Sequence, residues 1–364
     1  MNALAQDIDG ATGTPRRAVD AKVAVVLFGT GVVGGAFLKL LGTSVAAPLH
    51  LVGVANSRFQ QTRPRQLAER GIREHLNHDG DARDNEALLA ALEASDANLR
   101  VIVDATASPS LARHHAAWLA RGYHVVTANK AANGSSLAAW RELENAQRAG
   151  RTRYGDAATV GAGLPAISTV RRLHVCGDAL LTLEGVFSGS LGWLFSTYDG
   201  SEPFSRLLRR ARELGYSEPD PRMDLSGQDV ARKLLILART AGFRLASDEV
   251  IVENLVPEAL RDLPPEAFLA AAEALDAPLA ARHADAKSRG RVLRYLARLD
   301  QRGHARVGLD EVASDHPAAN LYGTDNLFAF TTTRYHAQPL VIRGPGAGTE
   351  VTAQALLGDI LTLL

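Results

Sequence analysis

The chain has 364 residues, of which 46% are hydrophobic, and its 40 Lys and Arg residues balance 40 Asp and Glu residues. A chain of this length exceeds what one hydrophobic core usually organises, so two domains are expected. The balanced charge argues against a nucleic-acid partner, and no apolar run reaches the ~20 residues that a membrane-spanning helix needs. The single cysteine, Cys176, cannot form an intramolecular disulfide, which favours a reducing cytoplasm as the location.

The first twenty residues lack the apolar core of a signal peptide, and we expect residues 1–20 to form a flexible extension. A buried strand is predicted over Lys22–Phe28, and it runs directly into a G-x-G-x-x-G string and an apolar helix. In this context the glycines permit a tight turn and let a pyrophosphate approach the helix N-terminus. The pattern predicts dinucleotide binding, with cofactor contacts at Gly29, Gly31, Val32, Val33 and Gly34.

The second predicted strand, His50–Ala55, ends in Asn56, Ser57 and Arg58. Proteins that bind NAD usually carry an acidic residue here for the ribose 2′-hydroxyl, whereas a nearby arginine accommodates a 2′-phosphate. The three residues are therefore predicted to contact NADP(H), with NAD(H) as the alternative cofactor. If Arg58 is only a solvated loop residue, this preference disappears.

Two further strands are predicted over Arg100–Asp104 and His124–Thr127, and they lead to Thr106 and Lys130. Ligands bind at the carboxyl ends of parallel strands, so both residues are candidates for the site, although a lysine that closes a strand is often merely solvated. The helical segment Leu111–Ala120 contains His114-His115. No cysteine or carboxylate accompanies this pair at metal-ligand spacing, so it is predicted to lie on a helix surface.

The segment Gly215–Lys233 places four carboxylates and a lysine where a proline-stiffened loop becomes a helix. From Ser226 onward the apolar residues recur at helical spacing, which puts Asp229 and Lys233 one turn apart on one face. A carboxylate beside an ammonium keeps that lysine charged and aimed, as a proton donor to a carbonyl oxygen requires. Two structural alternatives are a cap in which Ser226 and Asp229 open the helix, and an ordinary surface ion pair.

The second half lacks the alternation of strand and helix that marks a parallel sheet, and it is typical of an α+β domain. A helix is predicted over Ser135–Ala149, and strands over Leu180–Phe187, Arg291–Leu299, Ala305–Leu309, Leu327–Thr333 and Leu340–Arg343. The predicted fold class is α/β, with an N-terminal Rossmann-like dinucleotide-binding domain at 21–155, completed by 340–364. A second α+β domain at 156–339 would bind substrate, carry the catalytic residues and form a dimer. The glycine-rich stretch near Gly348 either starts the last helix or approaches the nucleotide.

With these segments in order, the sequence from about Lys22 to the C-terminus resembles homoserine dehydrogenase. It is most similar to the dehydrogenase half of the bacterial aspartokinase–homoserine dehydrogenases. No kinase-like segment precedes the matching strings and no regulatory segment follows them, so a monofunctional enzyme is expected. Those strings are Gly53–Ser57, Ala128–Lys130, Val160–Pro165, Gly215–Lys233 and Gly344–Gly348.

This resemblance implies the NADP-dependent interconversion of L-aspartate 4-semialdehyde and L-homoserine in threonine and methionine biosynthesis, carried out by a homodimer. It implies that Lys233 gives and takes the proton at the substrate oxygen and that Lys130 lies between nicotinamide and substrate. It also implies cofactor contacts at Gly215, Gly348, Thr106 and Lys130. The residues implied to bind the substrate are Glu218, Asp224, Asp229, Gly189, Ser190 and Tyr216.

The chain departs from the family pattern at a monovalent-cation site for Na⁺ or K⁺. The family commonly has an acidic residue three positions before Val160, and here that position is Ala157, with Asp156 one residue earlier. The backbone carbonyls of Val160, Ala162 and Leu164 remain as candidate ligands. The family also often has a second lysine after Lys130, where this chain has alanine.

Two other functions are compatible with the same motifs. One is an NADP-dependent oxidoreductase that acts on a different small amino-acid carbonyl compound. The other is a nucleotide-sensing protein that has lost catalysis. Such a protein would keep the glycine-rich loop but would have no reason to keep Asp229 and Lys233, so their presence counts against it.

Overall fold

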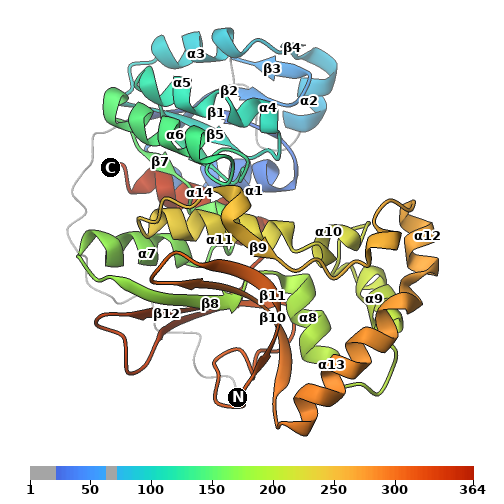
Figure 1. Ribbon diagram of the computed structural model, residues 1–364. Helices are drawn as coiled ribbons and strands as arrows, with labels where there is room; N and C mark the ends of the chain where they lie inside the picture. Colours follow the sequence, from blue (N-terminus) through green and yellow to red (C-terminus); the bar gives the residue numbers. More distant parts are fainter. Residues whose placement is uncertain (1–21, 63–71) are drawn as a thin grey trace, which may run out of the picture.

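The computed structural model describes residues 22–62 and 72–364, so the predicted extension at 1–20 lies outside the described residues. The chain forms two β-sheets, one of seven strands and one of six. Figure 1 shows the first sheet and its helices above the second sheet, with helices α11 and α14 near the junction of the two layers.

The first sheet is built around a fully buried central strand, β1, whose six residues are all apolar. Its parallel neighbours are joined at one edge by two short antiparallel strands, β3 and β4. This order is that of a Rossmann-like sheet, as predicted. Along the sheet the strands are β4 (Asp81–Ala82), β3 (Phe59–Gln61), β2 (Leu49–Ala55), β1 (Val23–Phe28), β5 (Leu99–Asp104), β6 (His124–Thr127) and β7 (Tyr154–Gly155).

Helices cover both faces of this sheet, because its central strands are buried on both sides. One face packs against α1 (Val32–Leu41), α2 (Ile72–Asp79) and α14 (Thr349–Leu361). The other packs against α3 (Asn85–Glu93), α4 (Pro109–Ala112), α5 (His115–Ala120) and α6 (Leu137–Gly150). The helix predicted over Leu111–Ala120 is thus two short helices.

The second sheet is antiparallel except for β9, which pairs in parallel with β11. In order, its strands are β13 (Leu340–Pro345), β12 (Asp325–Thr332), β8 (Leu180–Val186), β10 (Val292–Asp300), β11 (Ala305–Val312) and β9 (Val250–Val252). The largest apolar core lies between this sheet and its helices. These helices are α7 (Ala166–Val175), α8 (Gly189–Thr197), α9 (Phe204–Glu213), α10 (Arg222–Leu225), α11 (Gln228–Thr240), α12 (Pro265–Ala270) and α13 (Asp276–Ser288). Short 3₁₀ turns complete the chain: η1 (Ser44–Ala46), η3 (Ala157–Thr159), η4 (Ser247–Glu249), η5 (Glu258–Leu260) and η6 (Ala272–Leu275).

The domain boundary near the C-terminus differs from the sequence expectation, which grouped 340–364 with the first domain. Strand β13 pairs with β12 over its whole length, and its residues Leu340 and Ile342 pack against the core of the second domain. Helix α14 alone returns to the first domain, where it packs against α1. Only the last part of the predicted segment therefore completes the dinucleotide-binding domain.

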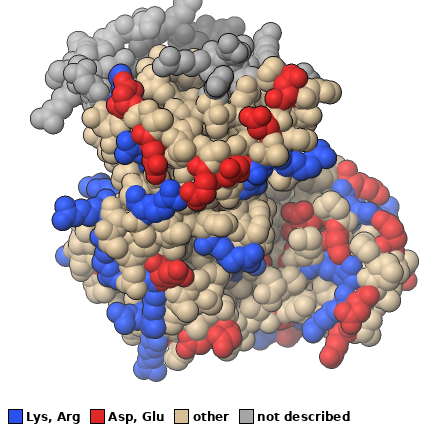
Figure 2. Space-filling view, turned by 90° about the horizontal axis from the view of Figure 1, so that it is seen from above, with Lys and Arg blue, Asp and Glu red and all other residues tan. Residues whose placement is uncertain are grey.

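Acidic and basic side chains lie interspersed on the face seen in Figure 2, without a continuous field of either sign. This distribution matches a chain whose 40 acidic residues balance 40 basic residues. Within 22–62 and 72–364, no helix is both long enough and apolar enough to cross a membrane.

Candidate active site

The glycine-rich loop after β1 has the geometry that a pyrophosphate requires. Gly29 has a φ of 97°, and a Cβ atom at Gly34 would lie 1.8 Å from the Gly29 carbonyl oxygen, so both positions need glycine. A Cβ atom at Gly31, the N-cap of α1, would meet nothing within 4 Å. Val32, in the first turn, is 69% exposed and Val33 half-buried. The helix N-terminus is thus open to an approaching phosphate, and the loop fits a dinucleotide.

At the end of β2, two arginines lie beside the loop that the sequence assigned to the ribose. Asn56 Oδ1 accepts hydrogen bonds from the backbone N–H groups of Arg58 and Phe59, both at 2.8 Å, which turns the chain and leaves Ser57 and Arg58 exposed. Arg83 donates to the Asn56 carbonyl oxygen at 3.2 Å. Sequence reasoning missed Arg83, because it follows the two-residue strand β4 and belongs to no motif.

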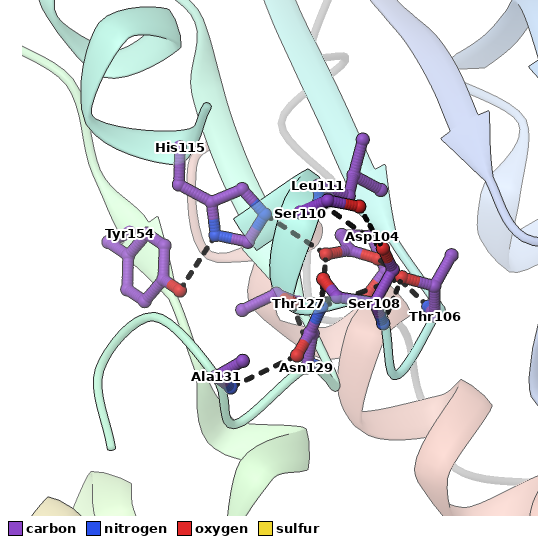
Figure 3. A network of polar contacts seen from close by, with 10 residues as sticks. All are labelled: Asp104, Thr106, Ser108, Ser110, Leu111, His115, Thr127, Asn129, Ala131 and Tyr154. Carbon is purple, nitrogen blue, oxygen red and sulfur yellow. Dashed lines mark hydrogen bonds and ion pairs between the residues drawn. The ribbon is translucent and has the colours of Figure 1, made fainter. Parts of the chain in front are cut away.

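A buried polar network lies at the carboxyl ends of β5 and β6 (Figure 3). Asp104, fully buried, accepts hydrogen bonds from the Thr106 hydroxyl at 2.7 Å and from Asn129 Nδ2 at 2.9 Å. His115 Nε2 lies 3.0 Å from Asp104 Oδ2, and Nδ1 lies 3.0 Å from the Tyr154 hydroxyl. The network therefore holds the side chains of Thr106 and of Asn129, the residue before Lys130, in place.

The network also corrects the sequence interpretation of His115. This histidine was expected on a helix surface, but its exposed fraction is 0%, whereas His114 is exposed as predicted. Burial, with the negative charges of Asp156 and Asp104, raises the pKa of Tyr154 well above its ordinary value. The hydroxyl therefore stays protonated and can donate to Nδ1 of His115.

Two lysines share one carboxylate at the N-terminal end of α11. Asp229 Oδ2 lies 2.8 Å from Lys233 Nζ, and Asp229 Oδ1 lies 3.4 Å from Lys130 Nζ. Lys233 also donates to the Phe187 carbonyl oxygen at 2.7 Å. The expected pair one turn apart is present, and Lys130 joins it from the other domain. The site therefore spans the two domains.

Asp229 is held in its charged form. Burial tends to raise its pKa, but the ammonium groups of Lys233 and Lys130 outweigh that effect and lower the pKa to about 2. At neutral pH the carboxylate is ionised and keeps both ammonium groups close to it. One negative charge thus orients two candidate proton-carrying or substrate-facing groups.

Helix α11 does not begin with the side-chain cap that Ser226 and Asp229 suggested, so that alternative is wrong. Its N-cap is Gly227, with a φ of 71° and no side-chain hydrogen bond to the helix. A Cβ atom there would lie 2.0 Å from the Tyr295 hydroxyl oxygen, which requires glycine. The Ser226 hydroxyl donates to the Met223 carbonyl oxygen and accepts only a long hydrogen bond, 3.4 Å, from the Gln228 backbone N–H. The Ser226 N–H donates to the Arg222 carbonyl oxygen, so Asp229 takes no part in a cap and remains available to the lysines.

The other predicted substrate residues gather around Asp224, on the extra helical turn α10. Its carboxylate accepts hydrogen bonds from the Ser190 hydroxyl and from the Glu218 backbone N–H, both at 2.9 Å. Burial raises the pKa of Asp224, although the two hydrogen bonds tend to lower it. The charges of Glu218 and Asp229 add to the increase. Three carboxylates are therefore close enough to influence one another.

The remaining predicted residues lie around this centre. Gly189 begins α8, and Gly215 has a φ of 72° in the loop that follows α9. Tyr216 is 41% exposed, and its ring centroid lies 5.4 Å from that of Trp193. Gly348 is the N-cap of α14, where the chain returns to the first domain.

A cavity of about 300 Å³ joins the strand ends of the first domain to α11. Thr106, Asn129 and Lys130 line it from the first domain, and Arg232 lines it from α11. The candidate cofactor residue Thr106 and the candidate catalytic residue Lys130 therefore share one space.

The loop predicted to bind a monovalent cation has an unusual backbone. Gly161 and Ala162 have φ angles of 74° and 54°, and a left-handed conformation is uncommon for alanine. The Leu164 carbonyl oxygen already accepts a hydrogen bond from the Ala166 N–H. Among the described residues, no cluster of three His, Cys, Asp or Glu side chains could hold a metal. The part of the chain that the structure describes therefore provides no cluster of side-chain ligands for a cation at this loop.

An unexpected carboxylate lies at the position where the family's acidic residue is missing. Asp359, on α14, accepts a hydrogen bond from the Ala157 backbone N–H at 2.9 Å. No local pattern predicts this contact, because the two residues are 202 positions apart.

The glycine-rich loop lies beside Thr106, and Thr106 shares a cavity with Lys130 of the carboxylate-bridged lysine pair. On a Rossmann-like sheet this arrangement is that of a nicotinamide-dependent oxidoreductase. Comparison with known families gives the particular member of that class. The family model for the homoserine dehydrogenase NAD-binding domain matches residues 29–155, and the homoserine dehydrogenase model matches residues 165–361. The chain belongs to the homoserine dehydrogenase family.

Two named relatives agree with this assignment, and a solved structure shares the fold. A homoserine dehydrogenase from Emericella nidulans is 36% identical over 95% of this chain and 99% of its own length. A bifunctional aspartokinase/homoserine dehydrogenase from Zea mays is 41% identical, over 94% of this chain but 38% of its own length, so the chain spans about two fifths of that relative. A Candida auris protein of unknown function has a similar structure, with a TM-score of 0.85, 33% identity and coverage of 94% of this chain and 98% of its own.

Proposed function

We propose that this chain interconverts L-homoserine and L-aspartate 4-semialdehyde with NADP(H) as the cofactor, in threonine and methionine biosynthesis. The observation that carries the proposal is the placement of Asp229 between Lys233 and Lys130. An alcohol–carbonyl interconversion needs a group that exchanges a proton with the reacting oxygen, and a charged, oriented lysine suits that need.

Lys233 is the proposed proton donor and acceptor. Its ammonium group donates to Asp229 and to the Phe187 carbonyl oxygen, which leaves one of its three N–H directions for the substrate oxygen. During reduction it would neutralise the developing alkoxide and protonate it, and during oxidation it would take the hydroxyl proton. A bound nicotinamide supplies or accepts the hydride. Lys130, held by the same carboxylate, would keep the substrate oxygen and the cofactor side of the site aligned.

The carboxylates account for recognition of an amino-acid substrate. Glu218, Asp224 and Asp229 place negative charge near the lysine pair, and a substrate ammonium would be attracted to it. Ser190 fixes one oxygen of Asp224, so the carboxylate has a defined direction. A carbonyl compound without an amino group would lose this interaction, which favours homoserine over its deaminated analogues.

The cofactor preference rests on the arginines at the end of β2. Arg58 is exposed, and Arg83 contacts the same loop, so both can meet a 2′-phosphate. No acidic side chain stands among Asn56, Ser57 and Arg58 to bind the 2′-hydroxyl of NAD. NADP(H) is therefore the proposed cofactor and NAD(H) the weaker alternative.

The test follows oxidation of L-homoserine at 340 nm with NADP and NAD in parallel, for the wild type and for Lys233→Ala. The substitution is expected to lower turnover about 10²–10⁴-fold and to leave dinucleotide binding unchanged by calorimetry. Lys287→Ala, which removes an exposed lysine, is the matched control. Turnover that survives in Lys233→Ala would reject the proton donor. A folded wild type that is inactive with both cofactors would reject the substrate.

Three further properties belong to the same proposal. The enzyme is proposed to be a cytoplasmic homodimer formed through the second domain, which light scattering of the purified protein tests. It is proposed to respond to Na⁺ or K⁺ through the carbonyls of Val160 and Ala162, supported by the left-handed backbone at Ala162. Replacing both ions with a bulky organic cation should then lower activity.

A further inference from the structure

The Lys233 ammonium group is held by a backbone carbonyl as well as by Asp229. Its Nζ donates to the Phe187 carbonyl oxygen at 2.7 Å. Phe187 lies between β8 and α8, and its buried ring stacks on that of Phe328 with centroids 4.6 Å apart. A carbonyl oxygen accepts hydrogen bonds mainly near the plane of its own peptide group. The orientation of this carbonyl therefore helps to decide where the remaining N–H of the ammonium group points.

A second side chain donates to the same carbonyl oxygen. Asn326, on β12, is 1% exposed, and its Nδ2 lies 3.3 Å from the Phe187 oxygen. Strand β12 pairs with β8 as far as Leu327 and Val186. The next position along this antiparallel register places Asn326 beside Phe187. A carbonyl oxygen has two lone pairs, so it can accept from the lysine and from the amide together.

Fold stability alone does not explain an amide at this position. The hydrogen bond from Asn326 to the carbonyl is long, and the Oδ1 atom of Asn326 is buried without a partner among the described residues. A buried acceptor that is left unpaired costs folding free energy. Leucine has a similar size and no polar atom, so it would avoid this cost. A polar group that lowers stability where it stands is typical of a functional site.

The loop that returns to the first domain presses on this amide. A Cβ atom at Gly346 would lie 1.9 Å from Cγ of Asn326 and 2.0 Å from its Nδ2, so the Gly346 backbone lies directly against the amide. Two residues later, Gly348 begins α14, which packs on the first domain. The amide therefore has little room to turn away from the Phe187 carbonyl.

We propose that Asn326 is a positioning residue for the proton donor. Its amide fixes the Phe187 carbonyl, and the carbonyl fixes the direction of the Lys233 ammonium group. Through Gly346, the loop that leads to α14 acts on the same amide. This inference rests on the role proposed above for Lys233, and it requires no contact of Asn326 with cofactor or substrate.

The first measurement observes Lys233 directly. The chain has five lysines, so protein labelled with ¹³C at the lysine Cε atoms gives five methylene signals in an NMR spectrum, and the signal missing from Lys233→Ala identifies Lys233. In Asn326→Leu the Lys233 signal should change position, because the ammonium group loses its fixed acceptor, while that of the exposed Lys287 stays. Gly346→Ala displaces the amide without removing it, and it should also move the Lys233 signal.

Activity gives the second readout. Asn326→Leu is expected to lower kcat for oxidation of L-homoserine about 10–10²-fold per dinucleotide-binding molecule, with little change in KM, because a misdirected donor affects only the reacting complex. Thr332→Val is the matched control. It removes a buried hydrogen bond to Asp178 from the same strand, about 20 Å further along. It should lose stability in urea titrations but keep both kcat and the Lys233 signal.

A double substitution tests whether Gly346 acts through the amide. In Asn326→Ala the atoms that oppose a Cβ atom at Gly346 are gone, so adding Gly346→Ala should lower kcat no further. A Lys233 signal that stays in place in both Asn326→Leu and Gly346→Ala would overturn the inference, as would a kcat that falls no more than in the control. If the wild type does not oxidise homoserine but the Lys233 signal moves as expected, the substrate assignment fails and the positioning of the lysine stands.

Discussion

Arg58 and Arg83 allow the cofactor preference to be tested at single side chains. If Arg58 meets a 2′-phosphate, Arg58→Ala removes a charge-assisted hydrogen bond, worth about 1.5–3 kcal/mol. We expect kcat/KM for NADP to fall about 10–100-fold while the value for NAD changes little. Arg113→Ala, at another exposed arginine of the first domain, is the control. An equal fall in kcat/KM for both cofactors would show that Arg58 does not bind the 2′-phosphate of NADP.

Asp104 illustrates how a buried residue outside the reaction can hold the site in place. Asp104→Asn turns an amide N–H₂ toward the donors Thr106, Asn129 and His115, which leaves at least one of them unpaired. A loss of about 1–3 kcal/mol in unfolding free energy is expected in urea titrations. Asp96→Asn breaks an exposed ion pair with Lys22 and should cost less than about 1 kcal/mol. Equal effects of the two substitutions would mean that the network adds no stability.

At the scale of elements, the strands that the sequence predicted correctly are those with a clear local pattern of apolar residues. The apolar strands of the first domain lie within a residue of their expected limits, since a buried parallel strand is recognisable from its composition. Strands β3 and β4 have only three and two residues, too few for any periodicity. Strand β13 was predicted from the sequence. Its place in the second sheet depends on pairing with β12, which no local pattern encodes.

In the candidate site, too, contacts within one element were predictable and contacts between distant elements were not. Asp229 and Lys233 were predictable as a pair, because one helical turn joins them. The contact of Asp229 with Lys130 and that of Ala157 with Asp359 join distant parts of the chain, so only the folded structure reveals them. His115 was misjudged for a related reason, since its partners Asp104 and Tyr154 lie on other elements.

The packing of α14 against η3 gives a pH-dependent prediction. Burial, aided by the charge of Asp156, raises the pKa of Asp359 to about 6, against the hydrogen bond from the Ala157 N–H and the charge of Arg171. A carboxyl whose pKa is raised on folding stabilises the protein fully below its unfolded pKa of about 4, and this contribution is lost as the pH rises through 6.

The asparagine in Asp359→Asn does not titrate, so the stability of this variant relative to the wild type should increase as the pH rises. Its unfolding temperature relative to wild type is expected to increase by roughly 2 °C or more between pH 4 and pH 8, measured by calorimetry. Glu350→Gln, which removes an exposed carboxylate of the same helix, is the matched control. A flat difference for Asp359→Asn would show that its carboxyl titrates normally.

At the scale of the whole molecule, the two domains are not independent segments of chain. The chain builds the Rossmann-like domain, then the second sheet, and finally returns through Gly346–Gly348 to place α14 on the first domain. Figure 1 shows this last helix, in red, beside α1. The two lysines of the proposed site likewise come from different domains and meet at Asp229. Folding of the first domain therefore needs residues made after the second.

This arrangement predicts that the end of the chain controls dinucleotide binding. Leu356 is fully buried in the core shared by α14 and α1, whereas Leu364 is 39% exposed. Leu356→Ala should lower the unfolding free energy by about 2–5 kcal/mol, and Leu364→Ala by less than about 1 kcal/mol, in urea titrations. Because α1 carries the phosphate-binding N-terminus, dinucleotide affinity should fall in Leu356→Ala before the second domain unfolds. Unchanged affinity in a destabilised variant would show that α14 supports the fold without supporting the cofactor site.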